Sequence, residues 1–345
     1  MISILIHSAR FLSLRTLLLA TLGAGAGCRF PIPDCPEKGG PAWWRVEVPH
    51  VEIWTDLDAD VAELVGYDLE RVRAALVAAA WPSLADRGDK LGAIIVRDQF
   101  ELSTFMDAAG RYVPRAGIHG GLVVATGDVS GKDFKHELAH ALSFQFGLPL
   151  TAPQWLAEGI ACYLETTTYG SPLGQLRVGD PDEPLANAAL HNRRSLRSLR
   201  GGNDMTPGFY GSSWLLVHFL ISQREPDLQR FVELLAQGQP EERAWPMAFP
   251  DLPPEQVDAA LAAYLHDNKF LFKQRAWIPP RVTPERQAMT DADAHAVRAL
   301  LIASVATAMS PDSRTKKANE ELKEAFRQDP NNQLATLVRR RYFGR

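Results

Sequence analysis

The segment Phe134-Lys-His-Glu-Leu-Ala-His-Ala-Leu-Ser-Phe144 places two histidines and a glutamate among apolar residues that favour a helix. His136 and His140 are four positions apart, so on a helix their imidazole rings lie on one face, ~6 Å apart at the backbone. This spacing allows both rings to reach one metal ion at ~2.0–2.1 Å. Glu137 points beside such a metal, where its carboxylate can take a proton from water. The segment therefore predicts a metal-binding helix.

A second segment, Pro153-Gln-Trp-Leu-Ala-Glu-Gly-Ile-Ala-Cys-Tyr-Leu-Glu165, supplies a candidate third ligand. Seventeen residues separate Glu158 from His140. Pro153 suits a helix start, and the apolar residues of the segment predict a face that packs on the first helix. Glu158 then projects toward the histidine pair. Two histidines and one carboxylate leave the fourth tetrahedral position of a zinc ion open, which is typical of a catalytic rather than a structural site.

Together the two segments resemble the gluzincin zinc metallopeptidases, and more closely the peptidase MA-like family of bacterial envelope proteins. The resemblance covers residues 43–270 and includes a third, looser motif, Tyr210-Gly-Ser-Ser-Trp214. It implies a zincin-like fold, a peptide or protein substrate, and hydrolysis with Glu137 as the general base. The implied Zn²⁺ ligands are His136, His140 and Glu158.

The same resemblance implies two further roles. Tyr210 is similar to a tyrosine that faces the metal at a helix start, where its phenol could donate to the oxyanion of a tetrahedral intermediate. The alternative is a tyrosine that packs in the core. The strand at 121–126 is implied as the sheet edge that aligns an extended peptide, and the residues expected to contact substrate are Gly121, Leu122, Val123 and Val124. His218, among apolar neighbours, is interpreted as a hydrogen-bonded core histidine.

One position departs from the gluzincin pattern. Many gluzincins have an acid four residues after the glutamate ligand, where it orients a zinc histidine, and this chain has Cys162 there. A metal-bound histidine needs a partner for its other ring nitrogen, so another acid or a carbonyl must supply it. The alternative function is a catalytically inactive pseudopeptidase that acts as an envelope scaffold or binding protein through its C-terminal helices. The complete set of ligands and base favours catalysis.

The order of the expected elements predicts an α+β fold, with a mixed-sheet lobe first and a helical lobe second, over a peptidase domain at 43–275. Apolar patterns predict strands at 44–55, 91–96 and 121–126. No convincing strand is expected after residue 132, and the predicted helices lie near 132–146, 153–166, 210–223, 226–237 and 254–270.

A further helix is expected between the first two strand regions, capped by Asp58 or Asp60. Its apolar residues recur at helical spacing and predict one buried stripe. The members of this stripe are Val61, Leu64, Val65, Leu69, Val72 and Leu76.

The C-terminal part is expected to contain a linker at 276–290 and two helices at 290–345. We call these two helices the TPR-like hairpin, because their residues follow the spacing of a tetratricopeptide repeat (TPR). The residues with this spacing are Ile302, Ala306, Ala318, Leu322, Ala325 and Pro330. One such repeat cannot bury its own apolar face, so it must pack on the preceding domain or on a protein partner. The alternative is a generic helical hairpin.

Residues 1–27 have the pattern of an export signal, since Arg10 and Arg15 precede a short apolar run and a small-residue stretch. Cys28 follows directly and resembles the lipidated cysteine of a bacterial lipoprotein. This predicts a location in the bacterial cell envelope, with membrane attachment through the lipid anchor only. The alternative is simple secretion. The residues at 28–42, rich in proline and glycine, are expected to form a linker.

Charge and cysteine content narrow the remaining possibilities. The net charge of −4 gives no general attraction to nucleic acid, so no nucleic-acid partner is expected. If Cys28 is acylated, Cys35 and Cys162 are the remaining cysteines, and the envelope would permit a disulfide between them. The sequence leaves that pairing open.

Overall fold

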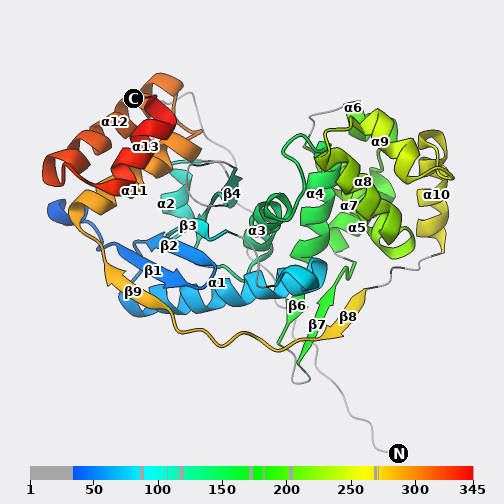
Figure 1. The fold of residues 1–345 in the computed structure, drawn as a ribbon, viewed down its shortest axis with the longest axis horizontal. Coiled ribbons are helices and arrows are strands. Elements are labelled where there is room, and N and C mark those ends of the chain that lie inside the picture. The colour runs from blue at the N-terminus through cyan, green and yellow to red at the C-terminus, as the bar shows by residue number, and fades with distance from the viewer. Residues whose placement is uncertain are drawn as a thin grey trace, which may run out of the picture. The chain divides into compact units, whose positions relative to one another are not determined.

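A mixed six-stranded sheet, covered by helices and followed by a helical region, forms the part of the chain that the structure describes (Figure 1). In this computed structural model the described residues are 34–344 without 86–88, 107, 115, 117–119, 171–173, 182, 202–204, 268–269 and 271. The predicted signal segment, Cys28 and the first part of the predicted linker lie outside them. The expected α+β class is confirmed. Among the described residues, no helix is both long enough and apolar enough to cross a membrane.

The strand order in the main sheet is β4-β5-β3-β2-β1-β9. β3 pairs in parallel with β2 and with β5, and the other neighbours are antiparallel. The strands are β1 (Trp44–Val48), β2 (Val51–Thr55), β3 (Leu91–Val96), β4 (Gly110–Val113), β5 (Leu122–Thr126) and β9 (Glu285–Ala288). The strands expected at 44–55, 91–96 and 121–126 are therefore present.

The expected place of strand 121–126 at the sheet edge is wrong. β5 lies between β3 and β4, so its backbone is paired on both sides. Its residues Leu122, Val123 and Val124 are buried, and a continuous apolar run of this kind is typical of an interior strand. Gly121 precedes β5 with a φ of 120°, a conformation that favours glycine. β4 is the edge strand on this side of the sheet, and its short sequence shows no apolar alternation.

Helices cover both faces of the main sheet. The neighbouring residues Ile94 and Ile95 of β3 point to opposite faces, as alternation along a strand requires. Ile95 packs in one core with α1 (Ala59–Ala80), whereas Ile94 packs in a second core with the C-terminal helices. The stripe expected for α1 begins one turn late, because Val61 and Leu64 are exposed while the other four positions are buried.

Three helices follow residue 290, not the expected two: α11 (Asp291–Val305), α12 (Pro311–Gln328) and α13 (Gln333–Phe343). Asn332 separates the last two, since its side chain accepts a hydrogen bond from the first turn of α13. The apolar residues with the TPR-like spacing, apart from Pro330, are buried in the core that the C-terminal helices share with the sheet. Part of the segment expected as a linker before them forms β9, which pairs with β1.

The helical region contains the expected helices α3 (Lys132–Gln145), α4 (Gln154–Glu165), α7 (Pro207–Gln223), α8 (Glu225–Ala236) and α10 (Pro254–His266). α4 packs between α3 and α7. Four shorter helices were not expected, and they are α2 (Gln99–Ser103), α5 (Glu183–His191), α6 (Leu196–Gly201) and α9 (Glu241–Ala248).

The expectation that no strand follows residue 132 is also wrong. β6 (Thr168–Tyr169), β7 (Gln175–Val178) and β8 (Lys273–Ala276) form a second antiparallel sheet, and β9 extends the first sheet. These strands are two to four residues long. β8 and β9 are mainly polar, so they carry no alternation by which a strand is recognised.

Candidate metal centre

Two packed helices bring the predicted ligands together. His136 and His140 lie one turn apart on α3, and Glu158 lies on α4, which packs against α3. Gly159 permits the close approach of α7 on the other side of α4, since a Cβ there would meet the carbonyl oxygen of Ser213 and the side chain of Val217. The three candidate ligands are therefore held by backbone that is fixed through tight helix packing.

The geometry of the three ligand atoms fits a tetrahedral metal. His136 Nε2 lies 3.2 Å from His140 Nε2 and 3.2 Å from Glu158 Oε2. The third side of the triangle, from His140 Nε2 to Glu158 Oε2, is 3.4 Å. Ligand bonds of ~2.0–2.1 Å at tetrahedral angles require ligand atoms separated by about 3.3–3.4 Å. The triangle thus fits a zinc ion with one coordination position left for another group.

Glu165 is the hydrogen-bond partner of His136, in place of the acid that many gluzincins have at the position of Cys162. His136 Nδ1 donates to Glu165 Oε2 at 2.7 Å, which directs Nε2 toward the triangle. Glu165 lies seven positions after Glu158, or two helical turns, so both carboxylates project from the same side of α4. Cys162 lies on the same side and also contacts His136. Nothing in the sequence singled Glu165 out except this heptad spacing.

The site is electrostatically suited to a cation. Burial alone would raise the pKa of Glu158, but hydrogen bonds with His136 and His140 outweigh burial and lower it to about 2. Burial opposes protonation of His136, yet its contacts with Cys162, Glu158 and Glu165 raise its pKa well above the ordinary value. Burial raises the pKa of the Cys162 thiol to about 11. The carboxylates therefore favour positive charge at this point, from a proton or from a metal ion.

Glu137 lies beside the triangle and not in it. Its Oε2 accepts a hydrogen bond of 2.5 Å from the backbone N–H of Tyr112 in the edge strand β4. The side chain also lies against Gly110, where a Cβ would come within 3.2 Å of the Glu137 side chain. Glu137 is thus fixed between the candidate ligands and the sheet edge, as a general base next to a bound substrate would be.

Tyr210 faces the same space from the first turn of α7. Its ring centroid is 6.3 Å from that of His136, and burial followed by the nearby Glu158 raises the pKa of its phenol. Two cavities, of about 370 and 400 Å³, adjoin the triangle, and His136, Glu137 and Tyr210 line both. The candidate centre is therefore flanked by a cavity on each of two sides.

His218 and Cys35 lie apart from the centre, whereas Cys162 adjoins His136. His218 is fully buried, with Nδ1 2.8 Å from the Tyr264 hydroxyl and Nε2 2.9 Å from the Gly179 carbonyl oxygen, so its interpretation as a core histidine is confirmed. Cys35 and Cys162 are free, buried cysteines with different neighbours. The disulfide left open by the sequence is not formed.

No protein-family model and no curated protein matches this chain. The function of the centre is therefore inferred from its own residues. These are the triangle of His136, His140 and Glu158, the partner Glu165, and the flanking Glu137 and Tyr210.

Proposed function

We propose that this protein is a zinc metallopeptidase of zincin-like fold, resembling the gluzincins, that hydrolyses peptide bonds. The observation that carries the proposal is the convergence of His136, His140 and Glu158 at metal-ligand separations beside the non-ligand carboxylate of Glu137. The accompanying proposal of a lipid-anchored envelope protein depends on the sequence around Cys28 alone.

Each side chain at the centre has a part in this chemistry. Zinc bound there would supply a Lewis acid that polarises the scissile carbonyl and makes water more acidic. Glu137 would accept the proton from water and pass it to the departing amine. Tyr210 would donate a hydrogen bond to the developing oxyanion. Glu165 would hold His136 in the tautomer that leaves Nε2 free to bind the metal.

The edge strand β4 is the proposed aligning element for substrate, in place of β5. β4 pairs with β5 alone among the described strands, and its residue Tyr112 contacts the proposed general base. An extended peptide can add to such an edge by main-chain hydrogen bonds, which brings its carbonyl groups next to Glu137.

Two observations favour catalysis over the pseudopeptidase alternative. Glu165 performs the orienting role that Cys162 cannot, so the departure from the gluzincin pattern does not leave His136 without a partner. The apolar positions of the C-terminal hairpin, expected to pack on the preceding domain or on a protein partner, pack on the main sheet. That surface is therefore not free to recruit a scaffold partner.

The proposal is tested by measuring bound zinc and hydrolysis of a peptide library for wild type, Glu137→Gln and His136→Ala. Glu137→Gln should retain stoichiometric zinc and lose ~10²–10⁴-fold in turnover, since it removes general-base help and no ligand. His136→Ala should lose both zinc and activity. Wild type that binds zinc and cleaves no member of the library would support the pseudopeptidase instead.

A further inference from the structure

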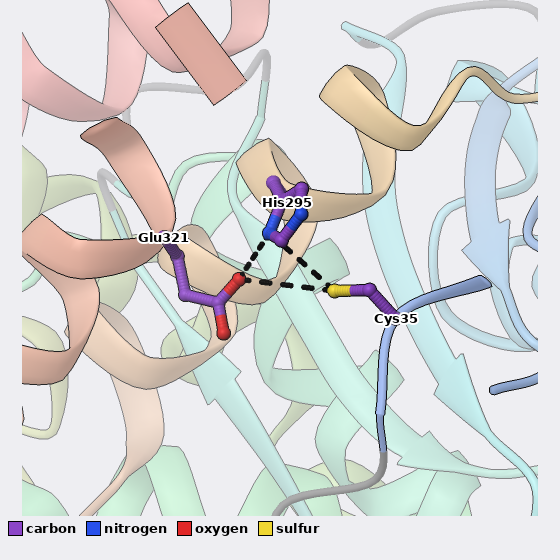
Figure 2. Close-up of side chains that lie close together, drawn as sticks. All are labelled: Cys35, His295 and Glu321. Carbon is purple, nitrogen blue, oxygen red and sulfur yellow. Dashed lines mark hydrogen bonds and ion pairs between the residues drawn. The ribbon is translucent and has the colours of Figure 1, made fainter. Parts of the chain in front are cut away.

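A second cluster of metal-ligating side chains lies where the N-terminal segment meets the C-terminal helices. Figure 2 shows that Cys35 comes from the N-terminal segment, His295 from α11 and Glu321 from α12, and that their side chains point toward one another. Cys35 and His295 are each 3% exposed. A thiol, an imidazole and a carboxylate, all of which zinc accepts as ligands, thus meet in a largely buried place without any sequence motif.

The ligand atoms are close to metal-binding separations. Cys35 Sγ lies 3.4 Å from His295 Nδ1 and 4.0 Å from Glu321 Oε2. His295 Nδ1 and Glu321 Oε2 are 2.6 Å apart, so a zinc ion would require them to separate by about 0.7 Å. Glu321 lies on α12, and its carboxylate would have to move away from His295 Nδ1 by this amount.

His295 and Glu321, the two candidate ligands on the C-terminal helices, each have a hydrogen-bond partner outside the cluster. His295 Nε2 lies 3.4 Å from Glu37 Oε1, an arrangement in which the second ring nitrogen donates to a carboxylate while Nδ1 is free for a metal. Glu321 Oε1 accepts hydrogen bonds from Arg298 at 3.0 and 3.2 Å, which leaves Oε2 facing the cluster. Metal ligands in proteins are commonly oriented in this way.

We infer that Cys35, His295 and Glu321 form a second zinc site that fastens the N-terminal segment to helices α11 and α12. The thiolate and imidazole select zinc over magnesium or calcium. Water completes the tetrahedron, so binding is weaker than at a site with four protein ligands. Because Cys35 lies seven positions after Cys28, the site would fix the folded chain close to its proposed anchor. It is independent of the proposed peptidase activity.

The competing interpretation is an ionic network without metal. Burial opposes protonation of His295, but contacts with Cys35 and Glu321 raise its pKa to about 10. An imidazolium held between carboxylates would therefore also account for these contacts, and only metal binding through the Cys35 sulfur distinguishes the two.

The test uses the full chain carrying Cys28→Ser, so that Cys35 and Cys162 are the only thiols. Metal-free protein in reducing buffer is titrated with Co²⁺, and the near-ultraviolet charge-transfer absorption of a cobalt–thiolate bond is recorded. We expect one thiolate-bound Co²⁺ per chain, displaced by Zn²⁺. Cys35→Ser should abolish the absorption, whereas the matched variant Cys162→Ser, beside the candidate catalytic centre, should retain it.

Two further variants test the role of Glu37 and the independence of this site from the peptidase centre. Glu37→Gln leaves all three ligands in place and should weaken Co²⁺ binding by about 10–100-fold. His136→Ala should leave the absorption unchanged, which separates this site from the peptidase centre. Absence of the thiolate absorption in the parent protein, or its survival in Cys35→Ser with an unaltered circular dichroism spectrum, would overturn the inference.

Discussion

His136 connects the two halves of the candidate peptidase centre. Its Nε2 faces His140 and Glu158, and its Nδ1 is bonded to Glu165. The orientation of one imidazole therefore depends on two carboxylates of α4, which lie two turns apart. Substitution of the outer carboxylate should change metal affinity without removing a ligand.

Glu165→Gln should weaken zinc binding about 10–100-fold, because an amide holds the His136 N–H less strongly than a carboxylate does. Zinc affinity is measured by competition with a chromogenic chelator, and thermal unfolding of the metal-free protein checks the fold. The control Glu255→Gln changes an exposed glutamate of α10 and should leave affinity unchanged. Equal affinity in Glu165→Gln and wild type would show that Glu165 does not orient the ligand.

Tyr210→Phe keeps the ring and its packing but removes the phenol. If the phenol stabilises the oxyanion, turnover should fall by roughly 10²–10³ while zinc content persists. Combined with Glu137→Gln, the loss should be less than the product of the single losses, since both act on one step. Tyr342→Phe in α13 is the matched control. Wild-type turnover in Tyr210→Phe would assign Tyr210 to packing, and the buried His218 could not replace it.

The contact between α4 and α7 positions the proposed oxyanion donor relative to the candidate ligands. α4 carries Glu158 and Glu165, and α7 carries Tyr210 in its first turn. The two helices approach closely at Gly159, opposite Ser213 and Val217. The spacing of these helices therefore sets the distance between the proposed oxyanion donor and the ligands.

Gly159→Ala should push α4 and α7 apart, because the added methyl group meets backbone as well as a side chain. Overpacking of this kind lowers the free energy of unfolding by ~1–3 kcal/mol, which urea denaturation can measure. Gly201→Ala at the end of α6 is the control, since nothing lies within 4 Å of its Cβ. Equal stability of both variants would contradict the close helix contact.

For the molecule as a whole, the main sheet separates two cores and carries a buried acidic pair at the ends of its strands. Asp56 follows β2 and Glu101 lies in α2, with Arg97 after β3 as the neighbouring cation. Burial, and then the charge of Asp56, raise the pKa of Glu101 from 4.5 to about 8. Burial also raises the pKa of Asp56. One proton is therefore retained by this pair on folding.

Because Asp56 and Glu101 retain a proton in the folded chain, we expect the protein to become less stable as pH rises. Between the unfolded pKa of 4.5 and the folded value of about 8, the unfolded chain releases a proton that the folded chain keeps. The free energy of unfolding consequently falls across this window. Glu101→Gln should reduce the fall between pH 5 and pH 8 in urea denaturation, whereas the exposed control Glu242→Gln should not. An unchanged pH profile in Glu101→Gln would contradict the buried pair.

The elements with a clear hydrophobic period, and the residues that this period places, can be predicted from the amino-acid sequence alone. His136 and His140 share a face because they are four positions apart on a helix, and the apolar face of α4 directs Glu158 toward them. The strands at 91–96 and 121–126 are equally predictable as strands, since continuous apolar runs mark them, although their places in the sheet are not. These features are local, so a single sequence contains enough information to predict them.

The features that depend on pairing between distant segments become apparent only in the folded chain. β4 rather than β5 lies at the sheet edge because the backbone of β5 is paired on both sides, and the polar strands β8 and β9 acquire their conformation from the strands beside them. Cys35 meets His295 across 260 positions of sequence. No periodicity encodes such contacts, because they form only when burial of the apolar faces brings separate elements together.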